Sequence, residues 1–173
     1  GDFGSGVNSV LLTNPNIAPG YSYTTNLPND GFYSITNNTG AWNLYSSWLS
    51  IRDNSQDPNG YMMVVNASFA PGLFYDKTIN DICGNTLYEF TADVINLIKS
   101  NTANHIDPVI DFLIDGQVRF STGLIPKTEK WITYGFTFTA PENASSVRLT
   151  LRNNAPGGFG NDLALDNISF RAC

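Results

Sequence analysis

The sequence predicts an all-β domain, folded as an antiparallel sandwich or barrel, and three observations support this prediction. About ten short runs alternate apolar and polar residues, and turn residues such as Gly, Pro, Asn and Asp separate them. Amphipathic helical patterns are weak; residues 95–100 come nearest to one, and that run is short. Charged residues make up only 14% of the chain, as in turn-rich β proteins. Strands without intervening helices pair antiparallel, in a sandwich or a barrel.

The 173-residue length suits one domain, because an all-β sandwich of this size buries a full core without a metal or a disulfide. Hydrophobic residues make up 42% of the chain and aromatic residues 13%, as in folded globular proteins. The sequence shows neither an internal repeat nor a linker. It begins at GDFGSG, without the basic and apolar regions of a signal peptide. We therefore expect residues 1–173 to form a single module, excised from a larger secreted protein.

The formal net charge is −6, and the nine Lys and Arg residues are spread along the chain. Nucleic-acid binders concentrate cationic side chains on one face, and anionic membrane surfaces attract basic segments, so both partners are disfavoured. The apolar runs are shorter than the roughly 18–20 residues of a membrane span. Acidic loops, in contrast, are free to hold cations.

The first half of the chain contains short strands and one long connection. Residues 9–13 (SVLLT) predict a first short strand, and 21–25 and 32–36 predict two strands in a hairpin-like pair. Periodicity fades over 37–60, and a loop of that length inside a compact domain is usually functional. Residues 61–67 (YMMVVNA) are almost continuously apolar, which predicts a strand buried on both faces.

The second half of the chain alternates more regularly. Residues 73–79 predict a strand, and 87–97 predict a longer strand with one face in the core and one face in water. An Asp-Gly pair between two strand-like runs in 106–121 is a strong hairpin signal. Residues 131–141 and 145–153 continue the alternation, each with large apolar side chains on one face.

A turn rich in Gly, Pro and Asn leads into the last predicted strand, within residues 153–173. Strict alternation puts Asp166 on one face with Ala164 and Ile168. An ionised carboxylate among apolar neighbours costs several kcal/mol unless it is paired, hydrogen-bonded or bound to a metal. We therefore expect a partner for Asp166, either a metal ion or backbone N–H groups that the carboxylate caps.

Acidic and amide side chains also collect on two loops. Calcium takes about six to eight oxygen ligands in flexible geometry, and carbonyls exposed by Gly and Pro can supply some of them. The alternative is that these residues serve only as turn formers. The donors are Asp2, Asp53, Asn54, Asp57 and Asn59.

Two segments together resemble a known pattern: DNSQDPNGYMMVVNAS at 53–68 and GNDLALDNISFRAC at 160–173. They are similar to MAM domains and to carbohydrate-binding modules of families 4, 9 and 22, which pair an acidic turn and a Gly-Tyr-Met strand with a closing strand carrying Ala-Leu-Asp. The resemblance covers most of the chain. MAM domains carry more cysteines than this sequence, so modules of secreted bacterial surface proteins are the closer match.

The resemblance implies a jelly-roll β-sandwich of the galactose-binding-domain-like type. It also implies structural calcium near the N-terminus and the closing strand. Because Asp166 is expected on an inward face, it is the central ligand of this site. The expected calcium ligands are Asp2, Asp53, Asp57, Asn59, Asp162 and Asp166.

Aromatic residues punctuate the long polar connection at Trp42, Tyr45 and Trp48. Their flat faces can stack on the CH groups of a sugar ring, and polar side chains on the wet faces of nearby strands can bond its hydroxyl groups. The alternative is that these rings pack in the core. The candidate ligand-binding residues are Trp42, Tyr45, Trp48, Arg52, Glu89, Asp93, Arg148 and Arg152.

The two cysteines, Cys83 and Cys173, are expected to form a disulfide in an exported protein, with two buried free thiols as the alternative.

Sequence signals for an enzyme are weak. Glu89 and Asp93 share a strand face at a spacing that a glycosidase could use, but neither has a motif around it. The sequence also lacks a Gly-x-Ser-x-Gly motif, and its single histidine, His105, lies in a polar loop.

The sequence therefore predicts a non-catalytic carbohydrate-binding or adhesion module, extracellular and stabilised by calcium. Its expected partners are a glycan or cell-surface polysaccharide and other domains of the parent protein. The alternative is a structural or protein-binding module of a cell-surface adhesin, and a small jelly-roll glycosidase or lyase is a remote third possibility.

Overall fold

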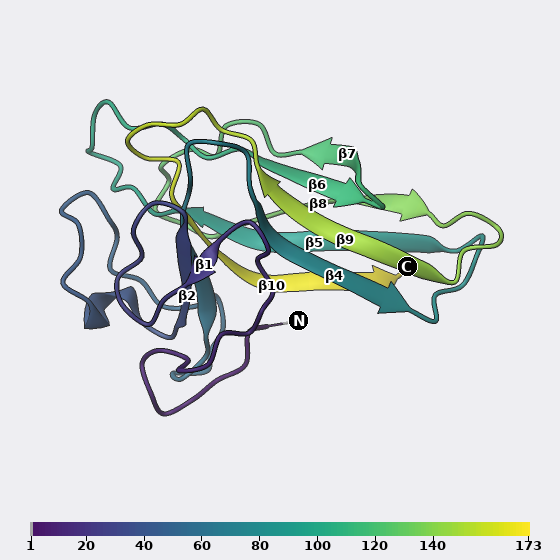
Figure 1. The fold of residues 1–173 in the computed structure, drawn as a ribbon, viewed down its shortest axis with the longest axis horizontal. Helices are drawn as coiled ribbons and strands as arrows, with labels where there is room; N and C mark the ends of the chain where they lie inside the picture. The colour runs from purple at the N-terminus through teal and green to yellow at the C-terminus, as the bar shows by residue number, and fades with distance from the viewer. Residues whose placement is uncertain (1) are drawn as a thin grey trace.

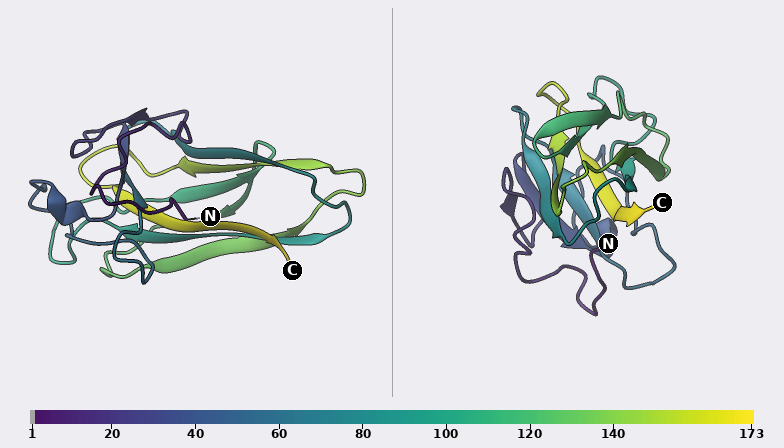
Figure 2. Two further views of the ribbon diagram at one scale, coloured as in Figure 1. Left: turned by 90° about the horizontal axis from the view of Figure 1, so that it is seen from below. Right: turned by 90° about the vertical axis from the view of Figure 1, so that its right-hand side faces the viewer.

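The computed structural model describes residues 2–173, and these residues form a sandwich of two facing β-sheets (Figures 1 and 2). A six-stranded sheet has the order β1-β2-β3-β10-β5-β8, and a four-stranded sheet has the order β4-β9-β6-β7. Residues 2–173 contain no α-helix. The prediction of an all-β sandwich is therefore confirmed. The strands are β1 (Ser22–Tyr23), β2 (Phe32–Thr36), β3 (Met62–Asn66), β4 (Leu73–Asn80), β5 (Leu87–Asn96), β6 (Ile110–Ile114), β7 (Gln117–Ser121), β8 (Ile132–Thr139), β9 (Ser146–Asn153) and β10 (Leu163–Ala172).

The apolar rows expected on the strands meet between the two sheets. Phe90 on β5 contacts Phe112 on β6 edge to face, with 5.1 Å between ring centroids. The Asp-Gly turn joins β6 and β7 with φ values of 49° at Asp115 and 81° at Gly116, as a tight hairpin requires. Residues 95–100 continue and follow β5 instead of forming a helix. Within the described chain, no helix has the length and apolar character needed to cross a membrane.

The expected hairpin between residues 21–25 and 32–36 is wrong, because β1 and β2 pair in parallel. A tight hairpin needs a short turn of the Asn-Gly type, and the connection here is longer. Residues 9–13 do not form the expected strand either. They make an isolated bridge from Val10 to Thr36, because β1 already occupies the start of that edge of β2.

Strand β3 is buried on both faces, as predicted. Met63 and Val65 face the core between the sheets, whereas Met62 and Val64 join a second apolar cluster around Trp48. The long connection supplies part of this second cluster and contains a single turn of 3-10 helix, η1 (Thr39–Ala41). One function of the long connection is therefore to cover the outer face of the six-stranded sheet.

The closing strand β10 breaks the strict alternation that the sequence predicts. Its register with β5 shifts between Asp166 and Ser169, and Asn167 has a φ of 48°. This bulge turns Ile168 into the core between the sheets, together with Leu163 and Leu165. The expectation that Ile168 shares a face with Asp166 is therefore wrong.

Candidate functional site

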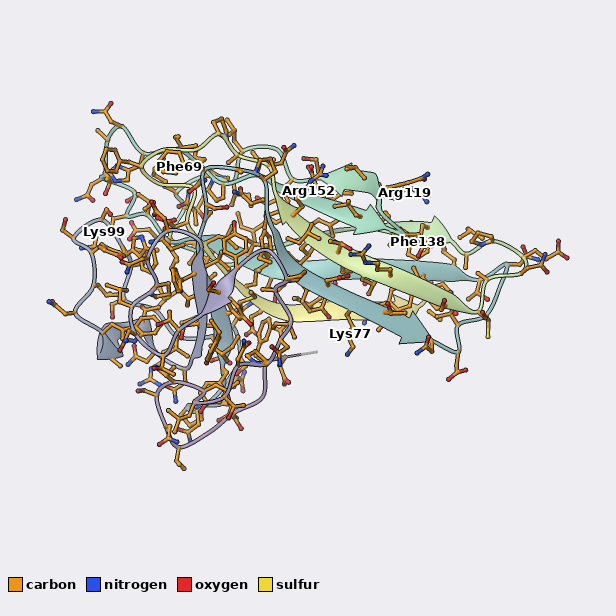
Figure 3. All side chains as sticks on the ribbon, viewed as in Figure 1. Phe69, Lys77, Lys99, Arg119, Phe138 and Arg152 are labelled. Carbon is orange, nitrogen blue, oxygen red and sulfur yellow. The ribbon has the colours of Figure 1, made fainter. Side chains whose placement is uncertain are left out.

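A cavity of about 780 Å³ opens at the loop-covered end of the sandwich. Figure 3 labels Phe69 at this end, on the left, well away from Arg119 and Phe138. We call this cavity the loop-end pocket. It is lined by Asn29, Asp30, Tyr45, Ser46, Ser47, Trp48, Asn66, Phe69, His105, Gly158, Phe159, Gly160 and Asp162.

A glycine-rich loop forms one wall of the pocket. Gly158 and Gly160 have φ values of 144° and 99°, which side chains rarely allow, and a Cβ on Gly160 would lie 2.6 Å from Ile106 N. Ile106 N donates a hydrogen bond to Phe159 O at 2.8 Å. The loop is thus fastened by its backbone, and the Phe159 ring is left 84% exposed.

Aromatic side chains supply the apolar surface of the pocket. Tyr45 contacts Trp48 edge to face, with 5.0 Å between ring centroids. Phe69, which packs against Gly157, is 68% exposed, whereas Trp48 is 2% exposed. Exposed rings gathered at a cavity mark a surface where a ligand can bind.

The loop that begins at Pro28 is held in place from two sides. Tyr45 Oη donates to Pro28 O at 3.0 Å, and Asn66 Nδ2 donates to the same oxygen at 2.9 Å. Asn66 is buried at the end of β3, so the rigid sheet positions this loop. Asn29 and Asp30 are consequently fixed at the rim of the pocket.

Two polar groups at the rim are available to a ligand. The exposed Asp30 carboxylate has no hydrogen-bond or ion-pair partner among residues 2–173. His105 Nδ1 lies 2.9 Å from Ala103 O, so in the neutral ring Nδ1 donates and Nε2 is left as an acceptor.

Asp162 lies buried at the base of the pocket. Its Oδ2 accepts a hydrogen bond from Trp48 Nε1 and its Oδ1 accepts one from Ala67 N, both at 3.1 Å. Burial raises the pKa of this carboxyl to about 7, the two hydrogen bonds oppose the rise, and the nearby Asp30 adds to it. Asp162 thus belongs to the loop-end pocket.

Asp166 is fully buried and has the kind of partner that the sequence left open as an alternative. Its Oδ2 accepts from Asn54 N and its Oδ1 from Asn167 N, both at 2.8 Å. Burial raises the pKa of Asp166 to about 6, the two hydrogen bonds lower it, and the nearby Asp53 and Asp93 raise it.

The structure brings together part of the expected calcium site. Asp53 packs closely on Gly60, since a Cβ added to Gly60 would lie 2.1 Å from Asp53 Oδ2. Ser5 in the N-terminal segment forms an isolated β-bridge with the same glycine. The N-terminal segment, the acidic turn and β10 therefore meet near Asp53 and Asp166.

The other expected ligands have different partners. Asp2 accepts a hydrogen bond from Gly4 N, Asp57 accepts one from Asn59 N, and both carboxylates are exposed. Over residues 2–173, no three His, Cys, Asp or Glu side chains lie close enough together to hold a metal ion. The six expected ligands therefore do not form one site.

Asp93 is buried, although the sequence placed it on a wet face. It accepts hydrogen bonds from Asn54 Nδ2 and Asn167 Nδ2, both at 2.9 Å, and from Thr133 Oγ1. The acidic turn and the β10 bulge cover this part of β5, so Asp93 holds these elements together.

The remaining charged candidates lie outside the lining of the loop-end pocket. Each has a polar partner on its own part of the surface. The contacts are Arg148 with Asp76, Arg152 with Asp111, Arg171 with Glu89, and Arg52 Nη1 with Pro58 O.

Among the aromatic candidates, Tyr45 and Trp48 line the pocket, whereas Trp42 packs half-buried against the second apolar cluster.

The structure also corrects both expectations for the cysteines: Cys83 and Cys173 are free and exposed. Strand pairing already ties the C-terminus to β5, as Cys173 N donates to Leu87 O at 3.0 Å.

Sequence reasoning missed most of the pocket lining. Two of the missed residues carried a signal, because Phe69 precedes a Pro-Gly turn and Phe159 stands between two glycines. Apolar rings in such turns lie at the surface. The missed residues are Asn29, Asp30, Ser46, Ser47, Asn66, Phe69, His105, Gly158, Phe159 and Gly160.

Comparison with known proteins identifies the fold alone. No family model matches the chain, and no curated protein matches it. A cyclase from Fischerella sp. TAU, solved in complex with 4-(1H-indol-3-yl)butan-2-one, is 13% identical with a TM-score of 0.60, covering 94% of this chain and 88% of the cyclase. The enzymatically active domain of bacteriophage CBA120 tailspike protein 4 is 13% identical with a TM-score of 0.50, covering 91% of this chain and 19% of the tailspike.

A sugar-binding protein, the EclA C-terminal domain, is 18% identical with a TM-score of 0.47, covering 62% of this chain and 81% of EclA. At such low identity, similarity to the cyclase and the tailspike defines a shared β-sandwich and leaves the function open. The weaker likeness to EclA defines neither the fold nor the function.

Proposed function

We propose that this chain is a non-catalytic carbohydrate-binding module whose glycan binds in the loop-end pocket. The observation that carries the proposal is the gathering of exposed Phe69 and Phe159 rings beside Asn29 and Asp30 at one cavity. Its volume, about 780 Å³, lies within the range of small-ligand sites, roughly 300–1,000 Å³. Aromatic faces would contact the CH groups of a sugar ring, and the polar rim would bond its hydroxyl groups.

The test is a glycan array followed by titration of each hit against Phe159→Ala. Because Phe159 is 84% exposed, its removal should leave the melting temperature unchanged. Loss of a stacking ring should weaken binding by on the order of 1 kcal/mol. The matched control is Leu124→Ala, which removes an apolar side chain that is 65% exposed and lies outside the pocket lining. Equal affinities for the two variants would refute the placement of the site.

A second candidate, hydrolysis of a glycosidic bond, is favoured by one observation. Asp30 and Asp162 line the same pocket, one exposed and the other buried with a pKa raised to about 7, and glycosidases pair two carboxyl groups of unlike environment. New reducing ends, released from a bound glycan by the native chain and not by Asp162→Asn, would establish turnover. Binding without new reducing ends supports the module.

Calcium stabilisation is also a proposal, confined to Asp53 and Asp166. Their mutual repulsion contributes to the raised pKa of Asp166, and a cation between them would relieve it. Loop carbonyls would have to supply most of the remaining oxygen ligands.

We propose further that the module belongs to a larger secreted or cell-surface protein. Expression of the full gene product, followed by cell fractionation to locate it, would test this.

A further inference from the structure

The ionisable side chains that line the loop-end pocket are two carboxyl groups and the His105 ring, and Asp162 adds negative charge only in part because its pKa is raised to about 7. Asp30 and Asp162 line the pocket, and no Lys or Arg of residues 2–173 does. The two carboxyls lie close enough that each contributes to raising the pKa of Tyr45, after the larger effect of burial. The field in the cavity therefore favours a cation over an anion.

Two lysines adjoin residues of the pocket lining, and neither side chain belongs to that lining. Lys127 Nζ is paired with Asp107 Oδ1 at 2.5 Å and also donates to His105 O at 3.0 Å. Lys99 contacts the pocket through its backbone, as Lys99 N donates to Ser47 O at 2.8 Å, and its side chain is outside the lining. Figure 3 labels Lys99 at this end of the molecule.

The two carboxyl groups differ in what they offer a ligand. Both oxygens of Asp162 already accept hydrogen bonds from Trp48 and Ala67. Asp30 is exposed and unpaired within the described chain, so its oxygens are free to accept bonds from an ammonium group. Aromatic rings add to this preference, because their faces attract cations, and Phe159 and Tyr45 line the same cavity.

We infer that the loop-end pocket selects amino sugars in their ammonium form over neutral sugars, and disfavours uronic acids, with Asp30 as the specificity-determining residue. This inference rests on the proposed function, since it assigns the class of sugar to the same site. Hydroxyl groups of the sugar would still bond to the polar rim, and the ammonium group would bond to Asp30.

The experiment uses three parent sugars, glucose, galactose and mannose, each as the neutral sugar, the 2-amino sugar and the uronic acid. Each is titrated near neutral pH and followed by amide chemical shifts of the pocket residues. We expect each amino sugar to bind more tightly than its parent by about fivefold, the upper range for an exposed ion pair. Uronic acids should bind more weakly than their parents. Added salt should reduce the preference for the amino sugar.

Asp30→Asn should bring the ratio of amino-sugar to neutral-sugar affinity close to one. Asp81→Asn is the matched control, because Asp81 is an exposed carboxylate outside the pocket, at a φ of 60° that Asn adopts readily, and its ratio should equal that of the native chain. Equal binding of all three forms of each sugar by the native chain would overturn the inference and leave the proposed function intact. The absence of binding by every sugar here together with a glycan array that gives no hit, or equally tight binding of cyclohexylamine, would overturn the proposed function itself.

Discussion

Asp162→Asn should change how the stability of the fold depends on pH. Burial raises the folded-state pKa of Asp162 from its ordinary value of 3.8 to about 7. As pH rises from 4 to 7, the unfolded chain loses this proton while the folded chain keeps it, so folding becomes less favourable. At about 1.4 kcal/mol per pH unit, the shift corresponds to roughly 4 kcal/mol of stability lost by pH 7, and none further above it.

The amide introduced by Asp162→Asn cannot ionise, so this loss should be absent in the variant. The amide has a single acceptor oxygen, and either Trp48 Nε1 or Ala67 N would be left without a partner, at a cost of about 1–3 kcal/mol. The variant should therefore be less stable than the native chain near pH 4 and should gain about 4 kcal/mol relative to it by pH 8.

Urea unfolding followed by far-UV circular dichroism measures the difference, because Trp48 fluorescence would respond to the substitution itself. Asp81→Asn is the control for loss of one carboxylate at the surface, and its curve should run parallel to that of the native chain. Asp166, whose pKa is raised to about 6, also makes the fold less stable as pH rises. This effect is equal in the native chain, Asp162→Asn and Asp81→Asn, so it cancels in the comparison. A constant free-energy difference between native chain and Asp162→Asn across this pH range would refute the reasoning.

Three further predictions follow from the same structure. Removal of calcium by a chelator should lower the melting temperature, since a ligand at a hundredfold excess over Kd stabilises the fold by about 2.7 kcal/mol. The Asp166→Ala variant should lose this sensitivity to chelator, and the Asp57→Ala variant should keep it. Identical melting of the native chain with and without chelator would contradict the calcium site. Trp48→Ala should cost about 3–5 kcal/mol in urea unfolding because the ring is buried, and a cost below about 1 kcal/mol would contradict that assignment. Gly160→Ala should lower the free energy of unfolding by about 1–3 kcal/mol, because the φ of Gly160 is 99° and an added Cβ would meet Ile106 N. The same variant should weaken glycan binding, and unchanged binding would show that the loop adapts.

The strands could be predicted from sequence where a local pattern was enough. Alternation placed the apolar rows of β5, β6, β8 and β9, and the Asp-Gly pair placed the hairpin between β6 and β7. The bulge in β10 could not be predicted in this way. It depends on Asn54 and Asp93, which bond Asp166 and Asn167 from other elements.

The pocket was harder to predict because its wall comes from distant loops. Asn29 and Asp30 precede β2, Phe159 precedes β10, and the pairing of both strands with β3 brings these residues to one pocket. Asp162 directly precedes β10, Asp166 lies on it, and the resemblance to carbohydrate-binding modules implied one metal site shared by both. In the structure Asp162 bonds Trp48 at the pocket and Asp166 bonds Asn54 at the acidic turn, so one segment serves two separate places.

The loops, rather than the strand faces, are the better place for recognition in this fold. On the outer face of the four-stranded sheet, Arg148 and Arg152 are already paired with Asp76 and Asp111, so a ligand there would have to displace an ion pair. The long connection contributes Trp48 to the cluster that covers the outer face of the six-stranded sheet. The loop-end pocket, in contrast, offers exposed rings and the unpaired carboxylate of Asp30, so a ligand that binds there gains contacts without breaking existing ones.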